Sequence, residues 1–273
     1  MRTPNLNADD DAIVAATRNW LERAVIGLNL CPFAKAVYVK EQVRYVVANA
    51  TTPEQLLETL MDELQHLSDT AAEKVDTTLI IHPFVLGDFE DYNEFLDVAD
   101  AALEDMQLDG ELQVASFHPL YQFADTDIND ISNYTNRAPD PILHLLREDS
   151  IARAVEAFPQ AEDIFEKNIE TMEQLGHDGW DKLHVGPACG GRGRPRTDAF
   201  TGNPRHPRRA PGYPMRGGLL DHVRRSLPRL RPHGGRGRAL GVDEHRRQGA
   251  RLAAHPGAGL PAPQQITAIN YLY

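Results

Sequence analysis

The sequence has little cysteine and no long apolar run, and each shortage excludes a class of protein. It contains two cysteines, Cys31 and Cys189, among 273 residues, too few for the disulfide framework of a small secreted domain. No apolar stretch approaches the length of a membrane span, and the polar, acidic start of the chain does not have the pattern of a signal peptide. We therefore expect a cytoplasmic protein without a membrane partner.

Lysine is absent after Lys182, and this marks a break in composition. Residues 1–187 hold 12 Lys and Arg against 36 Asp and Glu, a net charge of −24. Residues 188–273 hold 16 Arg against 4 acidic residues, with 14 of the 20 glycines and 10 of the 19 prolines. Because such a segment buries little apolar surface, we predict a flexible N-terminus (1–10), a single α/β domain (11–183) and a disordered Arg/Gly/Pro-rich tail (184–273).

Two interpretations of this tail stay open. An Arg- and Gly-rich arm binds nucleic acid electrostatically, whereas a GC-rich gene read out of frame yields the same residues without a function. The lack of lysine and of a repeated motif favours the second interpretation. The domain itself is too acidic to bind phosphate backbones, so nucleic acid is expected only through the tail.

Hydrophobic periodicity predicts alternating helices and strands in the domain. Short β-branched or aromatic runs indicate strands at 43–47, 77–82 and 112–117, and amphipathic runs indicate helices at 11–28, 52–67 and 88–106. Helices between consecutive strands favour right-handed parallel crossovers. We predict an α/β fold with a small, mostly parallel sheet of three or more strands covered by helices, and a helical C-terminal part with helices from 141, from 150 and at about 161–175. An α+β sandwich is the alternative.

Two predicted strands end in His-Pro, which indicates a site at one edge of the sheet. His82 and His118 each follow a strand directly, and ligands in open α/β sheets bind beyond the carboxyl ends of the strands. Cys31 is the one thiol of the domain. Since Pro32 suits the first position of a helix, we expect Cys31 to be its N-cap, where the helix dipole lowers a thiol pKa. The alternative for Cys31 is a small buried core residue.

A long polar loop follows the third predicted strand. Its densest part is Asn133-Tyr134-Thr135-Asn136-Arg137, and Arg137 is one of few cations in an acidic domain, suited to an anionic small molecule. We expect His144 one turn into the next helix, where it either points to the same edge or packs beside Leu143 and Leu146. The predicted substrate-binding set is Asn133, Tyr134, Asn136, Arg137 and His144. The alternative is a loop in which Arg137 pairs with a nearby aspartate.

Three stretches carry a resemblance to a known family. They are RNWLERAVIGLNLCPFA at 18–34, QVASFHP at 113–119, and SNYTNRAP at 132–139 followed by LHLLRE at 143–148. Together they resemble the bacterial domain of unknown function 1415 family over about residues 10–183, and the tail departs from that pattern. The family carries no known activity or cofactor, so the resemblance implies a relative and not a reaction.

These residues support three hypotheses. The first is a small-molecule enzyme with Cys31 as nucleophile, His118 or His82 as general base, and Arg137 with the loop asparagines binding an anionic substrate. The second is a Zn²⁺ site formed by Cys31, His82, His118 and His144, although no motif in the domain implies a cofactor. The third is a non-catalytic domain that binds a small ligand or a protein partner.

Overall fold

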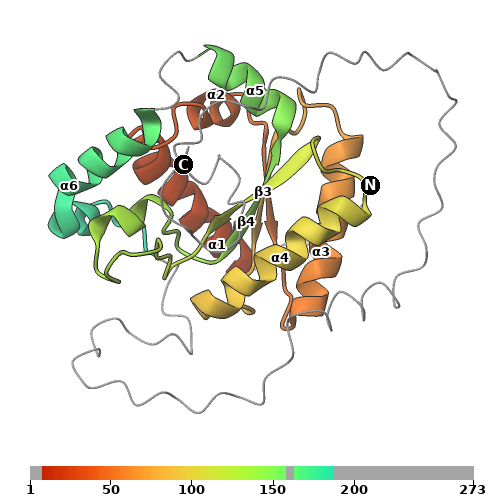
Figure 1. Ribbon diagram of the computed structural model, residues 1–273, viewed down its shortest axis with the longest axis horizontal. Coiled ribbons are helices and arrows are strands. Elements are labelled where there is room, and N and C mark those ends of the chain that lie inside the picture. The colour runs from red at the N-terminus through yellow and green to blue at the C-terminus, as the bar shows by residue number, and fades with distance from the viewer. Residues whose placement is uncertain (1–7, 158–162, 187–273) are drawn as a thin grey trace, which may run out of the picture.

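A computed structural model describes residues 8–157 and 163–186 of the chain. Four strands form one sheet in the order β1-β2-β4-β3 (Figure 1). Their bounds are β1 Val43–Val47, β2 Thr77–Ile81, β3 Leu112–Phe117 and β4 Ile142–Arg147. β1 and β2 pair in parallel, and β4 runs antiparallel to both β2 and β3. The α/β class is confirmed, but the sheet is mixed and not mostly parallel.

Two long helices cover one face of the sheet. α3 (Pro53–Asp69) connects β1 to β2, and α4 (Phe89–Asp105) connects β2 to β3. Both connections move across the sheet in the same direction between strands of the same orientation, so right-handed crossovers place both helices on the same side. Figure 1 shows α3 and α4 together there. Their buried leucines and aromatic residues pack on Ile80, Leu143 and Leu145 of the two central strands.

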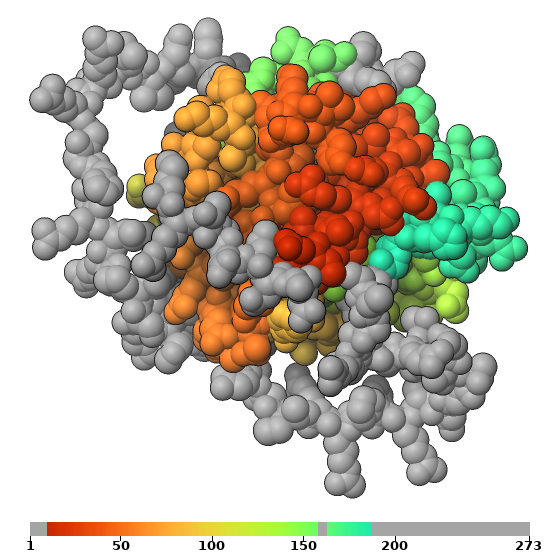
Figure 2. Space-filling view, turned by 180° about the vertical axis from the view of Figure 1, so that it is seen from behind, coloured from red at the N-terminus to blue at the C-terminus, as the bar shows by residue number. Residues whose placement is uncertain are grey.

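Shorter helices cover the opposite face. The described part of the chain begins there with α1 (Ala8–Trp20), continues into a π-helix, η1 (Leu21–Ile26), and then forms α2 (Ala34–Val39). Trp20, Leu79 and Phe117 belong to the apolar cluster beneath them. Figure 2 shows this face from behind, with the N-terminal helices in red to orange and α6 (Ile164–Lys182) in teal beside them. α6 packs on the 3₁₀-helix η2 (Ile131–Thr135).

The starts of α3 and α4 follow from their capping residues. Thr52 Oγ1 accepts a hydrogen bond from the backbone N–H of Gln55 at 3.4 Å. Asp88 Oδ1 accepts from the N–H groups of Glu90 and Asp91 at 2.9 and 3.4 Å. These side chains satisfy donors that have no partner inside the helix. Both predicted helix starts are confirmed.

The segment after Asp140-Pro141 was predicted to be a helix, and this is wrong. Residues 142–147 form β4, followed at once by α5 (Glu148–Ala157). Five of the six residues of β4 are buried, because the strand pairs on both edges and is covered on both faces. Its sequence therefore reads as a continuous apolar run, and periodicity alone does not separate such a strand from a buried helix.

The ends of the described part differ from the predicted ones. α1 begins at Ala8, earlier than the helix predicted from residue 11. α6 continues to Lys182, past Gly176, where the helix was expected to end. Gly176 has a positive φ of 62° and kinks the helix at this position. The predicted disordered tail lies outside the described residues from 187 onward. No helix in the described part is long and apolar enough to span a membrane.

Arg147 at the end of β4 holds the C-terminal end of α3 in place. Its guanidinium donates to the backbone carbonyls of Leu67, Thr70 and Val75. The first two lie in the last turn and at the C-cap of α3, where carbonyls lack the N–H partner four residues on that the helix interior provides. One side chain thus joins the sheet, α3 and the loop that leads into β2.

We expect Arg147→Lys to lower the free energy of unfolding by about 1–3 kcal/mol, since a single ammonium does not reproduce a planar group that reaches three carbonyls. Urea titration followed by circular dichroism measures the change. Arg23→Lys is the matched control, because exposed Arg23 reaches, within the described part of the chain, only the Leu183 carbonyl. Equal stability of the two variants would contradict this role of Arg147.

Candidate functional site

A cavity of about 570 Å³ lies on the face of the sheet covered by the N-terminal helices. β2 and β4 form its floor, η1 and α2 form one wall, and α5 forms the other. Most of its lining side chains are apolar, among them Trp20, Leu21, Val25, Phe33, Val37, Leu79, Phe117, Leu146, Ile151 and Ala154. A concave, mainly apolar space of this size with few polar groups is typical of a small-molecule site.

The polar side chains of the floor include His144 on β4 and Thr77 on β2. Thr77 Oγ1 lies 2.6 Å from His144 Nε2 and 2.6 Å from the carbonyl oxygen of Leu145. The hydroxyl has one proton, which it donates to the carbonyl, so Nε2 carries a proton and donates to the hydroxyl. Burial lowers the pKa of His144 to about 3. The imidazole is therefore neutral at physiological pH, in one tautomer.

The π-helix contributes to the cavity wall. η1 supplies Leu21 and Val25 from its wider turns, and π-turns occur frequently at functional sites. Gly27 follows this helix, and a Cβ atom at that position would lie 2.3 Å from the carbonyl oxygen of Arg23. Because glycine has no Cβ atom, the backbone at position 27 can lie this close to the carbonyl of Arg23.

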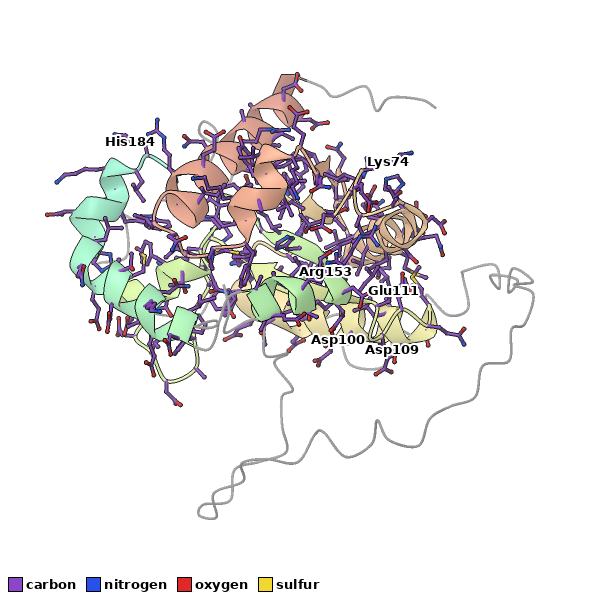
Figure 3. The ribbon with its side chains drawn as sticks, turned by 90° about the horizontal axis from the view of Figure 1, so that it is seen from above. Lys74, Asp100, Asp109, Glu111, Arg153 and His184 are labelled. Carbon is purple, nitrogen blue, oxygen red and sulfur yellow. The ribbon has the colours of Figure 1, made fainter. Side chains whose placement is uncertain are left out.

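α5 covers the cavity without being buried itself. None of its residues is buried, although Ile151, Ala154 and Ala157 line the cavity. The helix is attached by a short polar chain, in which Ser150 Oγ donates to Asp76 Oδ1 at 2.6 Å and Arg153 Nη2 donates to Ser150 Oγ at 3.0 Å. Figure 3 labels Arg153 on this helix. The apolar face of α5 therefore packs partly against open space.

The two predicted histidines do lie at one edge of the sheet. His82 follows β2 and His118 follows β3, and both are 0% exposed. The ring of Tyr92 from α4 lies between them, with centroids 5.7 Å from His82 and 5.0 Å from His118. His82 Nδ1 donates to the Val85 carbonyl at 3.1 Å, and His118 Nε2 donates to the Leu86 carbonyl at 3.2 Å. The two imidazoles thus hold the loop after β2.

The protonation of these histidines follows from their surroundings. His118 Nδ1 accepts from the backbone N–H of Leu120 at 3.0 Å, which requires a lone pair on that nitrogen. Burial, with a smaller contribution from nearby His118, lowers the pKa of His82 to about 4. His82 Nε2 is buried without a hydrogen-bond partner among the described residues. Both rings are placed as neutral groups within the protein.

Cys31 lies on the opposite face of the sheet from these histidines. It is 1% exposed and belongs to the apolar cluster with Trp20 and Phe117. α2 begins at Ala34 with Phe33 as its N-cap residue, so the expectation that Cys31 caps this helix is wrong. The structure brings His82 and His118 together, but it places Cys31 apart from them, behind the cavity wall.

The asparagines of the polar loop bind the loop itself. Asn133 is 0% exposed; its Oδ1 accepts from the N–H of Phe123, and its Nδ2 donates to the carbonyl of Asp127, both at 2.9 Å. Asn136 is also buried, and its Nδ2 lies 3.5 Å from the carbonyl oxygen of Ser116 in β3. Backbone groups of the loop and of β3 thus occupy the amides that were predicted to orient a substrate.

Arg137 and Tyr134 fasten the same loop. Arg137 donates to the carbonyls of Tyr121 and Ile128 at 3.2 and 2.7 Å, and its guanidinium lies 4.3 Å from the ring centroid of Tyr134. The Tyr134 ring also contacts Trp180 of α6, edge to face at 5.3 Å. Burial lowers the pKa of Arg137, which stays far above neutrality and keeps its charge.

Of the predicted site residues, His144 alone lines the cavity, and it does so from a strand and not from the predicted helix. The sequence reasoning missed Thr77, Asp76, Ser150 and Arg153. The available signal was the length of the run 142–147, six residues between Pro141 and the acidic start of the next helix, which suits a strand better than a helix. In the described residues, no three His, Cys, Asp or Glu side chains gather as a metal ion would require.

The fold and the cavity together define a small α/β domain with a four-stranded mixed sheet and a covered apolar pocket on one face. A family model described as "Protein of unknown function (DUF1415)" matches residues 12–182, and the chain belongs to this family. Residues 187–273 lie outside the match. A comparison with curated proteins finds no match, and a comparison with solved structures finds none.

The buried histidines predict an acid-sensitive fold. The ordinary pKa of a histidine is 6.5, whereas the folded values are about 4 for His82 and about 3 for His144. The unfolded chain thus binds more protons between pH 6.5 and pH 4, so stability is complete above pH 6.5 and decreases as the pH falls. Each histidine contributes a slope of up to about 1.4 kcal/mol per pH unit in that window.

Urea titrations at pH 7.5, 5.5 and 4.5 measure this slope. We expect His144→Gln to be less dependent on pH than the wild type, even where it is less stable at pH 7.5. His66→Gln, at an exposed position of α3, serves as the control and should retain the full slope. An unchanged slope in His144→Gln would contradict a buried neutral imidazole.

The burial of Cys31 predicts slow alkylation. In a full-length Cys189→Ser variant, Cys31 is the single thiol, and iodoacetamide should modify it only as fast as the protein opens. The rate should rise by orders of magnitude in denaturing urea. Rapid alkylation of the folded protein with an apparent pKa well below about 8.5 would instead support the nucleophile hypothesis.

Proposed function

We propose that this protein binds a small, largely apolar molecule in the cavity between α2 and α5. The supporting observation is a partly open cavity of about 570 Å³ beside two central strands, walled by aromatic and aliphatic side chains. Leu79, Phe117 and Leu146 belong to strands whose other faces pack against α3 and α4, so the hollow is confined to one side of the sheet. Burying apolar surface of a ligand there contributes about 25 cal/mol per Å².

The arrangement of the predicted catalytic groups favours binding over thiol chemistry. A nucleophilic cysteine needs a base within hydrogen-bond reach. Cys31 packs in the apolar cluster on one face of the sheet, while the rings of His82 and His118 pack around Tyr92 on the other. The enzyme hypothesis therefore stays a prediction that the alkylation experiment tests, and the third hypothesis from the sequence, a ligand-binding domain, is the one we adopt.

The neutral imidazole of His144 at the floor of the cavity determines which end of a ligand binds there. His144 is uncharged and already donates to Thr77. Around it lie Trp20, Leu79 and Phe117. An uncharged, mainly hydrocarbon end of a ligand suits this floor, because a buried charge without an opposite partner is costly.

Fluorescence titration with N-phenyl-1-naphthylamine, an uncharged apolar probe, tests the proposal. We expect saturable binding with about one site per chain, and at least about tenfold weaker binding in Ala154→Phe, whose ring fills the cavity from α5. Ala152→Phe is the matched control, since Ala152 lies on the same helix, is exposed and does not line the cavity.

Two results would refute the proposal. One is the absence of saturable binding to the full-length wild-type protein. The other is an equal loss in Ala154→Phe and Ala152→Phe while both remain folded by circular dichroism, because the probe would then bind elsewhere.

A further inference from the structure

We infer that the ligand of this cavity is an amphipathic anion, with its apolar body on the floor and a single negative group at the rim. This inference rests on the proposed function and adds the chemical class of the ligand. It is carried by the charges that surround the cavity, which differ from those of the rest of the domain.

Cations are concentrated at the cavity. Residues 1–187 hold 12 basic against 36 acidic residues, one cation for three acids. The cavity is lined by three basic residues, Lys40, Arg147 and Arg153, and by two acidic ones, Glu73 and Asp76. The ratio is therefore reversed, and a positive local potential in an otherwise negative domain attracts anions to this opening.

These cations are not neutralised by carboxylates of the described chain. The ion pairs within 4 Å in that part are Arg44–Glu63 and Lys167–Asp163, and they involve none of the cavity cations. The guanidinium of Arg147 is bound by backbone carbonyls, which leave its charge uncompensated. Asp76 Oδ1 accepts a hydrogen bond from the hydroxyl of Ser150. With Glu73 and Asp76 counted, the three cations leave the lining with a net charge of +1, and Lys40 and Arg153 are the cations that a ligand can reach.

The position of the accessible cations places the negative group at the rim. Lys40 and Arg153 are exposed, on the two opposite walls that α2 and α5 form. Arg153 uses one N–H on Ser150, and a guanidinium has five. The floor, in contrast, is apolar around a neutral imidazole. A carboxylate therefore binds between the two walls, and the hydrocarbon chain extends inward.

Displacement of N-phenyl-1-naphthylamine from the full-length protein tests this inference. The competitors are decanoate, 1-decanol and decylamine, which share the hydrocarbon chain and differ in charge. At pH 7.5 and low salt we expect decanoate to bind at least about tenfold more tightly than 1-decanol, and decylamine to bind more weakly than either. The preference for decanoate should shrink in 0.5 M salt, because the rim is exposed to solvent.

Substitutions at the rim locate the effect. Lys40→Gln and Arg153→Gln should each lower the ratio of the decanol and decanoate dissociation constants by about threefold, in line with exposed charges. Lys35→Gln is the matched control, since Lys35 lies on α2, is exposed and does not line the cavity. Its ratio should equal that of the wild type.

The outcomes separate this inference from the proposed function. If the naphthylamine binds but decanoate is not preferred over 1-decanol, the inference of an anionic ligand is refuted, whereas the proposed apolar binding site is retained. A preference that Lys35→Gln lowers as much as Lys40→Gln also overturns it, since the effect would then come from overall charge. Absence of naphthylamine binding overturns the proposed function itself.

Discussion

The position of β4 between β2 and β3, antiparallel to both, is the constraint on which the rest of the structure depends. Ile142 pairs with Ile81 on one side and with Phe117 on the other. β4 therefore starts at the same edge of the sheet at which β3 ends. The segment that connects β3 to β4 must leave the sheet at this edge and come back to it. That return is the polar loop, and Asn133 and Arg137 supply hydrogen bonds that its backbone would otherwise lack. At the far end of β4 the chain passes directly into α5, the outer wall of the cavity.

The elements set by local chemistry could be predicted from the sequence, and those set by tertiary pairing could not. Strands 43–47 and 112–117 have the predicted bounds, because β-branched and aromatic residues stand between clear turn or capping signals. β4 has no such local signature, since its leucines and His144 are covered on both sides. With β4 read as a helix, neither the mixed sheet nor the cavity wall formed by α5 follows. The location of the cavity therefore depends on the one strand that periodicity does not reveal.

The same holds for the candidate site residues: their positions at the sheet edge could be predicted, but their hydrogen-bond partners could not. The sequence correctly places His82 and His118 at one sheet edge, because β2 and β3 have the same orientation. It does not show that both rings donate to backbone carbonyls, or that the amide of Asn133 binds a carbonyl of the loop and the amide of Asn136 a carbonyl of β3. Polar side chains in a long loop serve either a ligand or the loop, and only the three-dimensional positions of backbone donors and acceptors decide between them.

The two faces of the sheet receive unequal cover, and this inequality explains why a cavity forms. α3 and α4 have 17 residues each and fully bury the side chains beneath them. On the other face α2 has six residues, and α5 has none buried. Val37, Ile151 and Ala154, which line the cavity from these two helices and are only half-buried, nevertheless remain apolar, where a polar residue would be tolerated if water alone filled the space. Each 100 Å² of apolar surface left open in this way forgoes about 2.5 kcal/mol of burial. A site that retains apolar side chains beneath short, weakly packed helices is suited to a ligand that completes the core when it binds.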